Sequence, residues 1–347
     1  MATLASIQRL KPIFFFASAI TIVLLLIILI FLRYTAFETQ KLPQQNQANL
    51  AFGNLPYPEF IPKTLQHNVK TITVSLKVLP KANENNSGNV YELTLESNST
   101  SKAQQLASVL GFSGNAEVDP KFMRWSEGQK TLTFDTTTNR INFSNSFNSD
   151  TERTISTPQD AEVKARNFLA QTSLLPLNTQ TKITSLKTLA LNFVSATDAN
   201  SADAYEIDFY ETLDNLIILG QSPKTGTVTA IVDKAGNLIK LSTRLYTLNL
   251  DNIGRYPLRN IQQASIDVKT EGVVVEVDIP DVDPLIGEVF DINNINLTEY
   301  QLTHFISISE NYIMPIYVFE GDLTLTDKRK GKATVYLPAI DNQYLKN

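Results

Sequence analysis

The sequence predicts an α+β protein in which an N-terminal transmembrane helix is followed by tandem units, each made of a helix and an antiparallel meander. Three observations support this fold class. One long apolar run lies near the N-terminus, short stretches of alternating apolar and polar residues recur through the rest of the chain, and two series of such stretches follow a capped helix pattern. The 347 residues are enough for two or three domains.

Composition places the chain among folded proteins and disfavours several function classes. Hydrophobic residues make up 43% and charged residues 19% of the sequence, as in globular domains. The net charge is -5, and every acidic residue lies beyond residue 33. A negative surface repels phosphate backbones, so nucleic-acid binding is disfavoured. The absence of cysteine excludes disulfides, thiolate nucleophiles and cysteine-based metal sites. A large exported domain without disulfides is more typical of bacteria than of eukaryotes.

The apolar run covers residues 12–32, twenty-one residues without a charge. At the rise of an α-helix, this length spans a hydrocarbon core of about 30 Å. A cleaved signal peptide would have a shorter apolar region that ends at small residues, whereas residues 31–36 offer no such site. We therefore predict that residues 1–33 form a cytoplasmic stub and an uncleaved anchor, which contacts the lipid bilayer through residues 12–32.

The charges around the anchor predict its orientation. Arg9, Lys11 and the terminal amine precede the apolar run, whereas Arg33 and Lys41 follow it. The balance favours an N-terminus inside the cell, because basic residues concentrate on the cytoplasmic side. We expect a single-pass protein of the cell membrane whose C-terminal region is extracytoplasmic.

Residues 34–66 are predicted to be a tether between the anchor and the folded region. They are rich in Gln, Asn and Pro and lack the periodicity of a helix or strand. Residues 52–60 contain aromatic and proline residues that would be unusual in a fully solvated linker. An alternative is that they pack on the first domain.

The first α+β domain is predicted at residues 67–150. Residues 71–79 and 90–96 alternate as half-buried strands do, and the turn-rich stretch between them predicts a hairpin. Residues 101–112 have apolar side chains at helical spacing and end at Gly111. Three short strands are then expected at residues 121–125, 131–136 and 140–145.

The second domain, residues 151–254, begins with a strong helix pattern. Thr157 can cap the helix, Pro158 occupies its first position and Asp160 completes a capping box. Four strands are predicted after this helix, and a turn through Gly236 joins the last two. One helix over an antiparallel meander is therefore expected.

The third domain, residues 255–347, repeats this order. Asn260 and Gln263 predict another capping box. Four strands are expected after the helix, at residues 272–279, 302–309, 314–323 and 333–340. The repeat is one of pattern more than of residue identity.

The residues give no support for a catalytic, metal or cofactor site, and none is predicted. The two histidines are far apart in the sequence and neither belongs to a nucleophile motif. The acidic stretch 278–283 resembles a calcium loop in composition, but the required glycine and glutamate spacing is missing. Carboxylate pairs on one strand, such as Glu206 with Asp208 or Glu211 with Asp214, fit the polar face of an alternating strand.

Aromatic residues near the C-terminus are the remaining candidates for recognition. If residues 314–322 form a strand, Tyr317 and Phe319 share one face while Glu320 lies on the other. Burial of the two rings leaves the carboxylate exposed, which avoids the cost of an unpaired buried charge. We therefore expect Phe319 in the core, and Tyr312, Tyr317 and Phe319 become candidate partner contacts if these rings are exposed.

Four segments resemble known exported families. Residues 157–169 and 226–241 are similar to PepSY-type domains, and residues 311–322 with 333–340 are similar to the C-terminal part of YycI-like regulators. Those are single-pass Gram-positive proteins. The resemblance implies an external α+β body of PepSY-like repeats, the domains 151–254 and 255–347 here, without catalytic residues, and a role in restraining a membrane sensor kinase.

Residues 52–56 and 110–112 are also similar to exported proteins of small-genome bacteria. The predicted domain at residues 67–150 is an addition to the regulator pattern.

The leading hypothesis is a membrane-tethered, extracytoplasmic binding or regulatory protein that is not an enzyme and that acts on a membrane or cell-envelope protein, such as a sensor kinase. One alternative is a cell-envelope hydrolase that uses carboxylates or a Ser–Lys pair, which a pocket with two desolvated titratable groups would favour. A further alternative is a structural spacer, which would need neither a cleft nor a large apolar patch.

Overall fold

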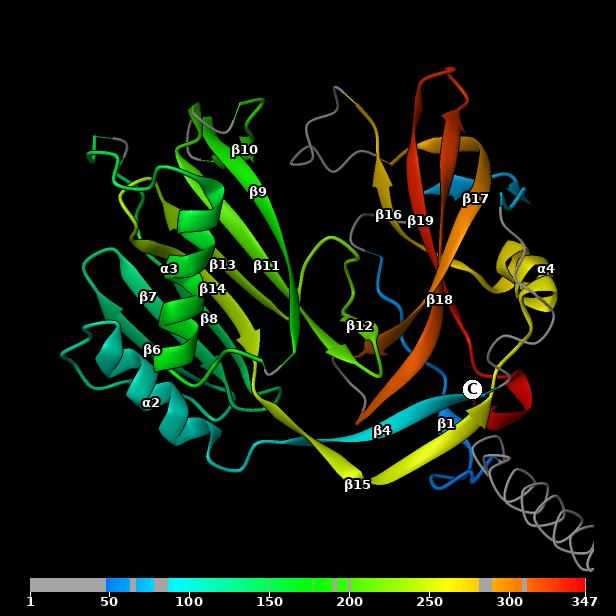
Figure 1. Ribbon diagram of the computed structural model, residues 1–347, viewed down its shortest axis with the longest axis horizontal. Coiled ribbons are helices and arrows are strands. Elements are labelled where there is room, and N and C mark those ends of the chain that lie inside the picture. The colour runs from blue at the N-terminus through cyan, green and yellow to red at the C-terminus, as the bar shows by residue number, and fades with distance from the viewer. Residues whose placement is uncertain are drawn as a thin grey trace, which may run out of the picture. The chain divides into compact units, whose positions relative to one another are not determined.

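A computed structural model divides the chain into two units, Met1–Gln47 and Ala48–Asn347, and the second is described here (Figure 1). The predicted span at residues 12–32 lies outside the described residues. Within the described ranges, no helix has both the length and the apolar character needed to cross a bilayer. The structure describes residues 48–62, 67–77, 87–148, 150–176, 178–189, 192–198, 201–280, 289–307 and 311–346.

The predicted α+β class is confirmed for this unit, which is mostly sheet. A set of antiparallel strands, here called the first sheet, carries helices α2 (Ser99–Val109) and α3 (Pro158–Gln171) on one face (Figure 1). Its strands, in spatial order, are β5 (Glu117–Val118), β6 (Phe122–Glu127), β7 (Lys130–Asp135), β8 (Arg140–Ser144), β14 (Leu238–Arg244), β13 (Val228–Asp233), β11 (Ala204–Leu213), β9 (Thr179–Leu189) and β10 (Asn192–Ser195).

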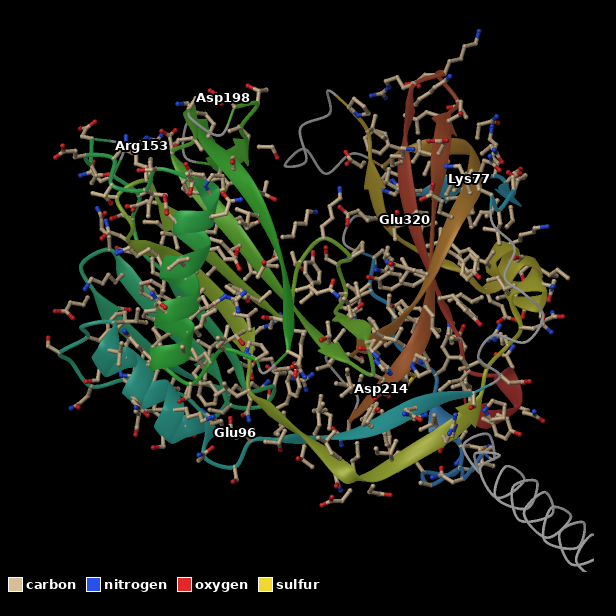
Figure 2. All side chains as sticks on the ribbon, in the orientation of Figure 1. Lys77, Glu96, Arg153, Asp198, Asp214 and Glu320 are labelled. Carbon is tan, nitrogen blue, oxygen red and sulfur yellow. The ribbon has the colours of Figure 1, made fainter. Side chains whose placement is uncertain are left out.

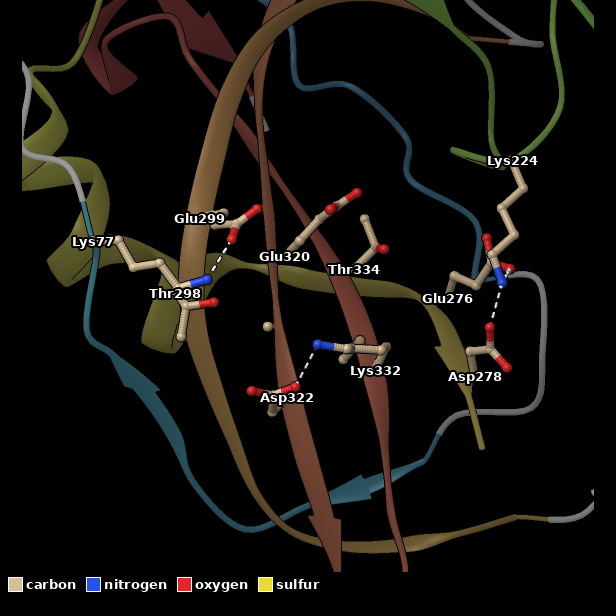
Figure 3. A pocket seen from close by; sticks show the side chains of 12 residues that line it. Lys77, Lys224, Glu276, Asp278, Thr298, Glu299, Glu320, Asp322, Lys332 and Thr334 are labelled. Atoms are coloured by element: carbon tan, nitrogen blue, oxygen red, sulfur yellow. Dashed lines mark hydrogen bonds and ion pairs between the residues drawn. The ribbon is translucent and has the colours of Figure 1, made fainter. Parts of the chain in front are cut away.

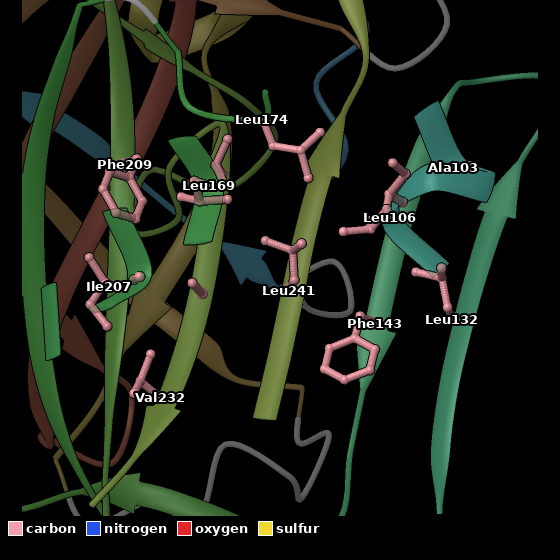
Figure 4. Packing of buried hydrophobic residues seen from close by; sticks show 14 of the residues in the cluster. Ala103, Leu106, Leu132, Phe143, Leu169, Leu174, Ile207, Phe209, Val232 and Leu241 are labelled. Carbon is pink, nitrogen blue, oxygen red and sulfur yellow. The ribbon is translucent and has the colours of Figure 1, made fainter. Parts of the chain in front are cut away.

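The core of this sheet forms where the two helices meet the strands. Leu106 of α2 and Leu169 of α3 are fully or almost fully buried against strand residues that include Phe143 and Leu241 (Figure 4). The capping box predicted for α3 is confirmed, because Thr157 Oγ1 accepts from Asp160 N and Asp160 accepts from Thr157 N. Helix start and helix face were therefore both readable from the sequence.

The second group of paired strands is here called the second sheet. The long strands β17 (Asp291–Ile306) and β18 (Tyr312–Leu325) run antiparallel at its centre, and helix α4 (Ile261–Glu271) packs on one face. The other members are β2 (Asn68–Val69), β3 (Ile72–Val74), β4 (Ser87–Leu95), β12 (Leu216–Leu219), β15 (Tyr246–Pro257), β16 (Val273–Asp278) and β19 (Lys330–Pro338).

Strand pairing crosses the predicted domain boundaries. The expected hairpin of residues 71–79 with 90–96 is wrong, because β3 pairs in parallel with β17 and β4 pairs with β15 and β18. Alternation predicts that a segment is a strand but does not specify its neighbour, and here the chosen partners are distant in sequence. The strands predicted at residues 121–125, 131–136 and 140–145 do form consecutive neighbours, as β6, β7 and β8.

Part of the predicted tether belongs to the fold. Leu55 is fully buried, and β1 (Leu55–Pro56) pairs in parallel with β20 (Leu345–Lys346), which follows the short 3-10 helix η3 (Asn342–Tyr344). Phe60 packs edge-on against Phe305, with ring centroids 4.9 Å apart. The aromatic and proline residues of this segment therefore pack as the alternative reading proposed, but against strands of the predicted third domain.

Both faces of β18 are buried along most of its length. Tyr317 and Phe319 point into the core under α4, with exposures of 7% and 0%. Ile316 and Val318 are fully buried on the opposite face, whereas Glu320 is exposed. The predicted burial of Phe319 and exposure of Glu320 are confirmed, and the second buried face results from Phe60 and other residues that cover it.

Truncation of Phe319 to alanine should lower the free energy of unfolding by about 3 to 5 kcal/mol, because it opens a cavity in a fully buried core. Glu320→Gln is the matched control one residue away and should leave stability nearly unchanged. Denaturant melts of both variants measure the difference. A midpoint for Phe319→Ala equal to that of the wild type would contradict this assignment of the core.

A histidine is buried where β17 meets β12. His304 is 1% exposed, and its ring lies edge-on to Tyr91, with centroids 5.7 Å apart. Neither ring nitrogen makes a hydrogen bond of good geometry within the described residues, although the backbones of Asn89 and Leu213 lie close by. Burial lowers the pKa of His304, and the nearby Asp214 carboxylate opposes this effect only in part.

This burial should make stability sensitive to acid. The unfolded chain binds a proton at His304 below about pH 6.5, whereas the folded chain resists protonation to a lower pH. The stability that depends on neutral His304 is thus complete above that pH and is lost as the pH falls toward the folded-state pKa. The free energy of unfolding should fall by up to about 1.4 kcal/mol per pH unit in this range, and His304→Phe should remove this contribution. Urea melts from pH 8 to pH 5 give the free energy of unfolding of both proteins. An equal change of this free energy with pH in the wild type and in His304→Phe would refute the prediction.

Candidate functional site

A concave, strongly charged patch covers one face of the second sheet (Figure 3). The cavity there has a volume of about 310 Å³. We call this patch the charged face. Its charged residues come from β16, β17, β18 and β19, from the segment after β3 and from the loop after β12, and they are Lys77, Lys224, Glu276, Asp278, Glu299, Glu320, Asp322 and Lys332.

Strand register arranges these side chains in two rows that cross the sheet. Residues directly opposite one another on neighbouring strands point to the same side. The first row carries three carboxylates and one hydroxyl, and the second alternates in charge. The first row is Glu276, Thr334, Glu320 and Glu299, and the second is Asp278, Lys332, Asp322 and Asn296.

The first row depends on a β-bulge. The register of β17 against β18 shifts between Leu297 and Glu299, so that Thr298 is the extra residue. Gly321 lies opposite this bulge, and a Cβ atom there would be 2.1 Å from the Asn296 carbonyl oxygen. Only glycine fits this close approach of two backbones. The bulge brings Glu299 directly opposite Glu320, and like charges in this position repel each other.

Lysine side chains neutralise most of the carboxylates. Lys77 Nζ lies 2.5 Å from Glu299 Oε1, and Lys332 Nζ lies 2.6 Å from Asp322 Oδ1. Lys224 Nζ bridges Glu276 at 2.8 Å and Asp278 at 2.9 Å (Figure 3). Five carboxylates face three ammonium groups, so the patch has an excess of two negative charges.

The excess charge is localised on the first row. Among the described residues Glu320 has no ion-pair or side-chain hydrogen-bond partner, and Glu276 Oε2 is buried without a hydrogen bond. A buried carboxylate oxygen with no partner is costly, and the exposed Glu320 carboxylate can accept a hydrogen bond from a ligand. The row therefore has acceptor capacity that the described chain leaves unused.

The pKa values on the charged face follow these pairs. The hydrogen bond from Lys77 holds the pKa of Glu299 below its usual value, and Lys332 does the same for Asp322. Burial opposes ionisation of Lys224, but the bonds to Glu276 and Asp278 raise its pKa overall. All three groups are therefore charged near neutral pH.

The spacing of the carboxylates in the first row bears on the type of cation that they could bind. Within the described residues, no group of three or more His, Cys, Asp or Glu side chains could hold a metal ion. The carboxylates are spread along strands, and an alkylammonium or guanidinium group bonds such separated acceptors readily. The arrangement suits lysine and arginine side chains more than a bare ion.

A second cavity, of about 450 Å³, contains two carboxyl groups in contrasting environments. Burial raises the pKa of Glu211, although a hydrogen bond from Tyr246 opposes the shift. Glu96 is instead paired with Lys102 at 2.6 Å. Figure 2 labels Glu96 near the start of α2. Carboxyl groups whose environments differ in this way can divide the roles of acid and base.

The aromatic candidates occupy the core. Phe319 is fully buried and Tyr317 donates its hydroxyl to the Arg259 carbonyl at 2.7 Å, whereas Tyr312 is half-buried against Phe52. Burial leaves no ring surface at Phe319 for a partner. The three residues share one strand with Glu320 and Asp322, which belong to the charged face.

The other sequence candidates are separated in space or engaged in the fold. Asp208 is buried and accepts from Gly226 N and Thr229 Oγ1, which is a structural role. Asp278 belongs to the charged face, whereas Asp281 and Asp283 lie outside the described residues. His67 Nδ1 accepts a hydrogen bond from Phe290 N.

The charged face was missed by sequence reasoning, although part of its pattern is visible. Glu320 and Asp322 alternate on β18, as do Lys332 and Thr334 on β19. Such alternation is typical of any solvated strand face, so it carries no information on its own. The register that aligns these strands with Glu299 and Glu276 became visible only in the fold.

Comparison with known proteins gives no relative for this chain: no family model, curated protein or solved structure matches it.

Proposed function

We propose that this chain is a membrane-tethered binding protein whose charged face recognises lysine or arginine side chains of a partner protein outside the cytoplasm. The observation that carries the proposal is the carboxylate row Glu276, Glu320 and Glu299, which has more negative charge than its lysines neutralise. Complementary charge gives such surfaces their specificity and speeds association.

The energetics of the patch suit reversible binding. Lys77 with Glu299 and Lys332 with Asp322 are exposed pairs, and pairs of this kind contribute little to stability. A partner cation can therefore replace a lysine without unfolding the sheet. The bulge at Thr298 and the register of four strands hold the backbone of the carboxylate residues in place, so little backbone conformational freedom is lost on binding.

The location outside the cytoplasm rests on the sequence. Residues 12–32 are apolar and uncharged, and Arg9 and Lys11 precede them. A partner held in or near the same membrane would be concentrated at the charged face, because tethering raises the effective concentration of both proteins. A sensor kinase with a basic external region is one partner of this kind.

A cell-envelope hydrolase is the second candidate. It is favoured by the cavity that Glu211 and Glu96 line, where one carboxyl is desolvated and the other is paired with Lys102. Hydrolysis of a cell-envelope substrate by the wild type, lost in Glu211→Gln, would support this candidate. A spacer needs no cavity, and the cavities of the folded unit therefore rank that alternative lowest.

Neutralising Glu320 should weaken binding of a cationic probe. We expect the full chain, in non-ionic detergent, to bind a fluorescent oligolysine peptide, and Glu320→Gln to reduce the affinity by about fivefold. Affinity should also fall as the salt concentration rises, because exposed charges are screened. Fluorescence anisotropy measures both effects.

Two controls make this test specific. Glu117→Gln removes an exposed carboxylate from β5 and should leave the affinity unchanged. An oligoglutamate peptide of equal length should not bind. Equal affinities for the wild type and Glu320→Gln would show that the peptide binds elsewhere and would remove the charged face from the proposal.

The anchor is tested separately by removing residues 1–47. The full chain should require detergent, whereas a chain that begins at Ala48 should stay in the aqueous phase, because the apolar span is gone. Starting later, near Asn54, would delete Asn49, whose side chain donates to the Ile253 carbonyl, and Phe52, which packs on Tyr312. Phase partitioning of the uncleaved full chain into water would disprove the anchor.

A further inference from the structure

A third cavity is basic, in contrast to the acidic charged face. It has a volume of about 630 Å³ and is lined by residues of β8, β13, β14 and β15, the loop after β12 and the segment Ile61–Pro62. Its charged lining residues are Arg140 and Arg244. No acidic residue is among the described residues that line it, although hydroxyl groups are frequent there.

The two arginines are held side by side by strand pairing. Arg140 on β8 lies directly opposite Arg244 on β14, so both side chains project from the same face of the first sheet. Like charges in this position repel each other. Asp135 lies opposite Arg140 on its other side, but its carboxylate accepts hydrogen bonds from Thr137 and Thr138 and forms no ion pair with the arginine.

The environment of Arg244 fixes its guanidinium without neutralising it. Nε donates to the Thr138 carbonyl at 3.0 Å and Nη1 donates to the Ser307 carbonyl at 2.7 Å. These acceptors are uncharged, and Nη2 has no hydrogen bond within the described residues. Burial, with repulsion from Arg140, lowers the pKa of Arg244. Arg140 itself is exposed and has no ion-pair or side-chain hydrogen-bond partner in the described part of the chain.

The lining adds neutral donors around this pair. Ser222 and Thr225 are lining residues that carry hydroxyl groups. Asp208 is buried and accepts hydrogen bonds from two lining residues, from Gly226 N at 3.1 Å and from Thr229 Oγ1 at 2.6 Å.

We infer that this cavity binds the oxyanion of a small polar ligand, either a carboxylate or a phosphate group, between Arg140 and Arg244. Two adjacent guanidinium groups match the acceptor geometry of either anion. Binding would relieve the repulsion between the two charges and supply the hydrogen bond that Nη2 lacks. This site is distinct in its residues and in the sign of its charge from the charged face, and the inference does not depend on the proposed function.

The test uses the full chain in non-ionic detergent, titrated with inorganic phosphate and, separately, with succinate, at constant ionic strength in chloride. At least one anion should raise the thermal midpoint in a saturable way, because a ligand of the native state stabilises it. Arg140→Gln should lower the affinity for that anion by at least about tenfold. Arg124→Gln, which removes an exposed arginine from β6, should bind as the wild type does.

A second readout separates binding from a structural role. In chloride alone, Arg140→Gln should be at least as stable as the wild type, because it removes the repulsion with Arg244. Arg244→Gln loses two bonds to carbonyl groups, so Arg140→Gln remains the decisive variant. A response to neither anion, or an equal response in wild type and Arg140→Gln, would overturn the inference. The anion with the larger saturable response identifies the ligand class.

Discussion

The pairing of β17 with β18 through the bulge at Thr298 is the constraint on which the second sheet depends. The bulge shifts the alternation by one residue, so that Leu297 before it and Tyr300 after it pack into the same core. Gly321 permits the approach, since a Cβ atom would contact the Asn296 carbonyl. Without the shift, one half of β17 would turn its apolar side chains to water. The same shift places Glu299 opposite Glu320, so core packing and surface chemistry have a common origin.

The two sheets are continuous through shared strands. Ala204–Glu211 of β11 pairs with β9, whereas Thr212 and Leu213 pair with β12, and β12 then pairs with β17. Backbone hydrogen bonds therefore run from the first sheet into the second. This continuity explains why His304 is buried, because the β12 pairing covers the part of β17 that carries it. It also explains why strands assigned to separate domains by sequence order become neighbours.

The charged groups that lie opposite a like charge follow a common physical logic. Strand register places like charges opposite each other, as Glu299 with Glu320 and Arg140 with Arg244, and each arrangement costs stability in the free protein. A fold selected for stability alone would separate such pairs. The two pairs lie in separate concave regions, one acidic and one basic, where a ligand of opposite charge would relieve the repulsion. Glu211 differs from these pairs, because burial and not repulsion raises the pKa of its carboxyl group.

Local chemistry made part of this structure readable in the sequence. The cap of α3 by Thr157, the strands β6 to β8 and the burial of Phe319 with exposure of Glu320 depend on periodicity and near neighbours, which the chain encodes directly. Tertiary structure decided the partners of β3 and β4, the packing of Phe60 and the bulge at Thr298. Each of these joins segments far apart in the chain, and alternation with a period of two residues fits many partners equally well. The charged face and the arginine pair exist only through such long-range register, so no local pattern could have revealed them.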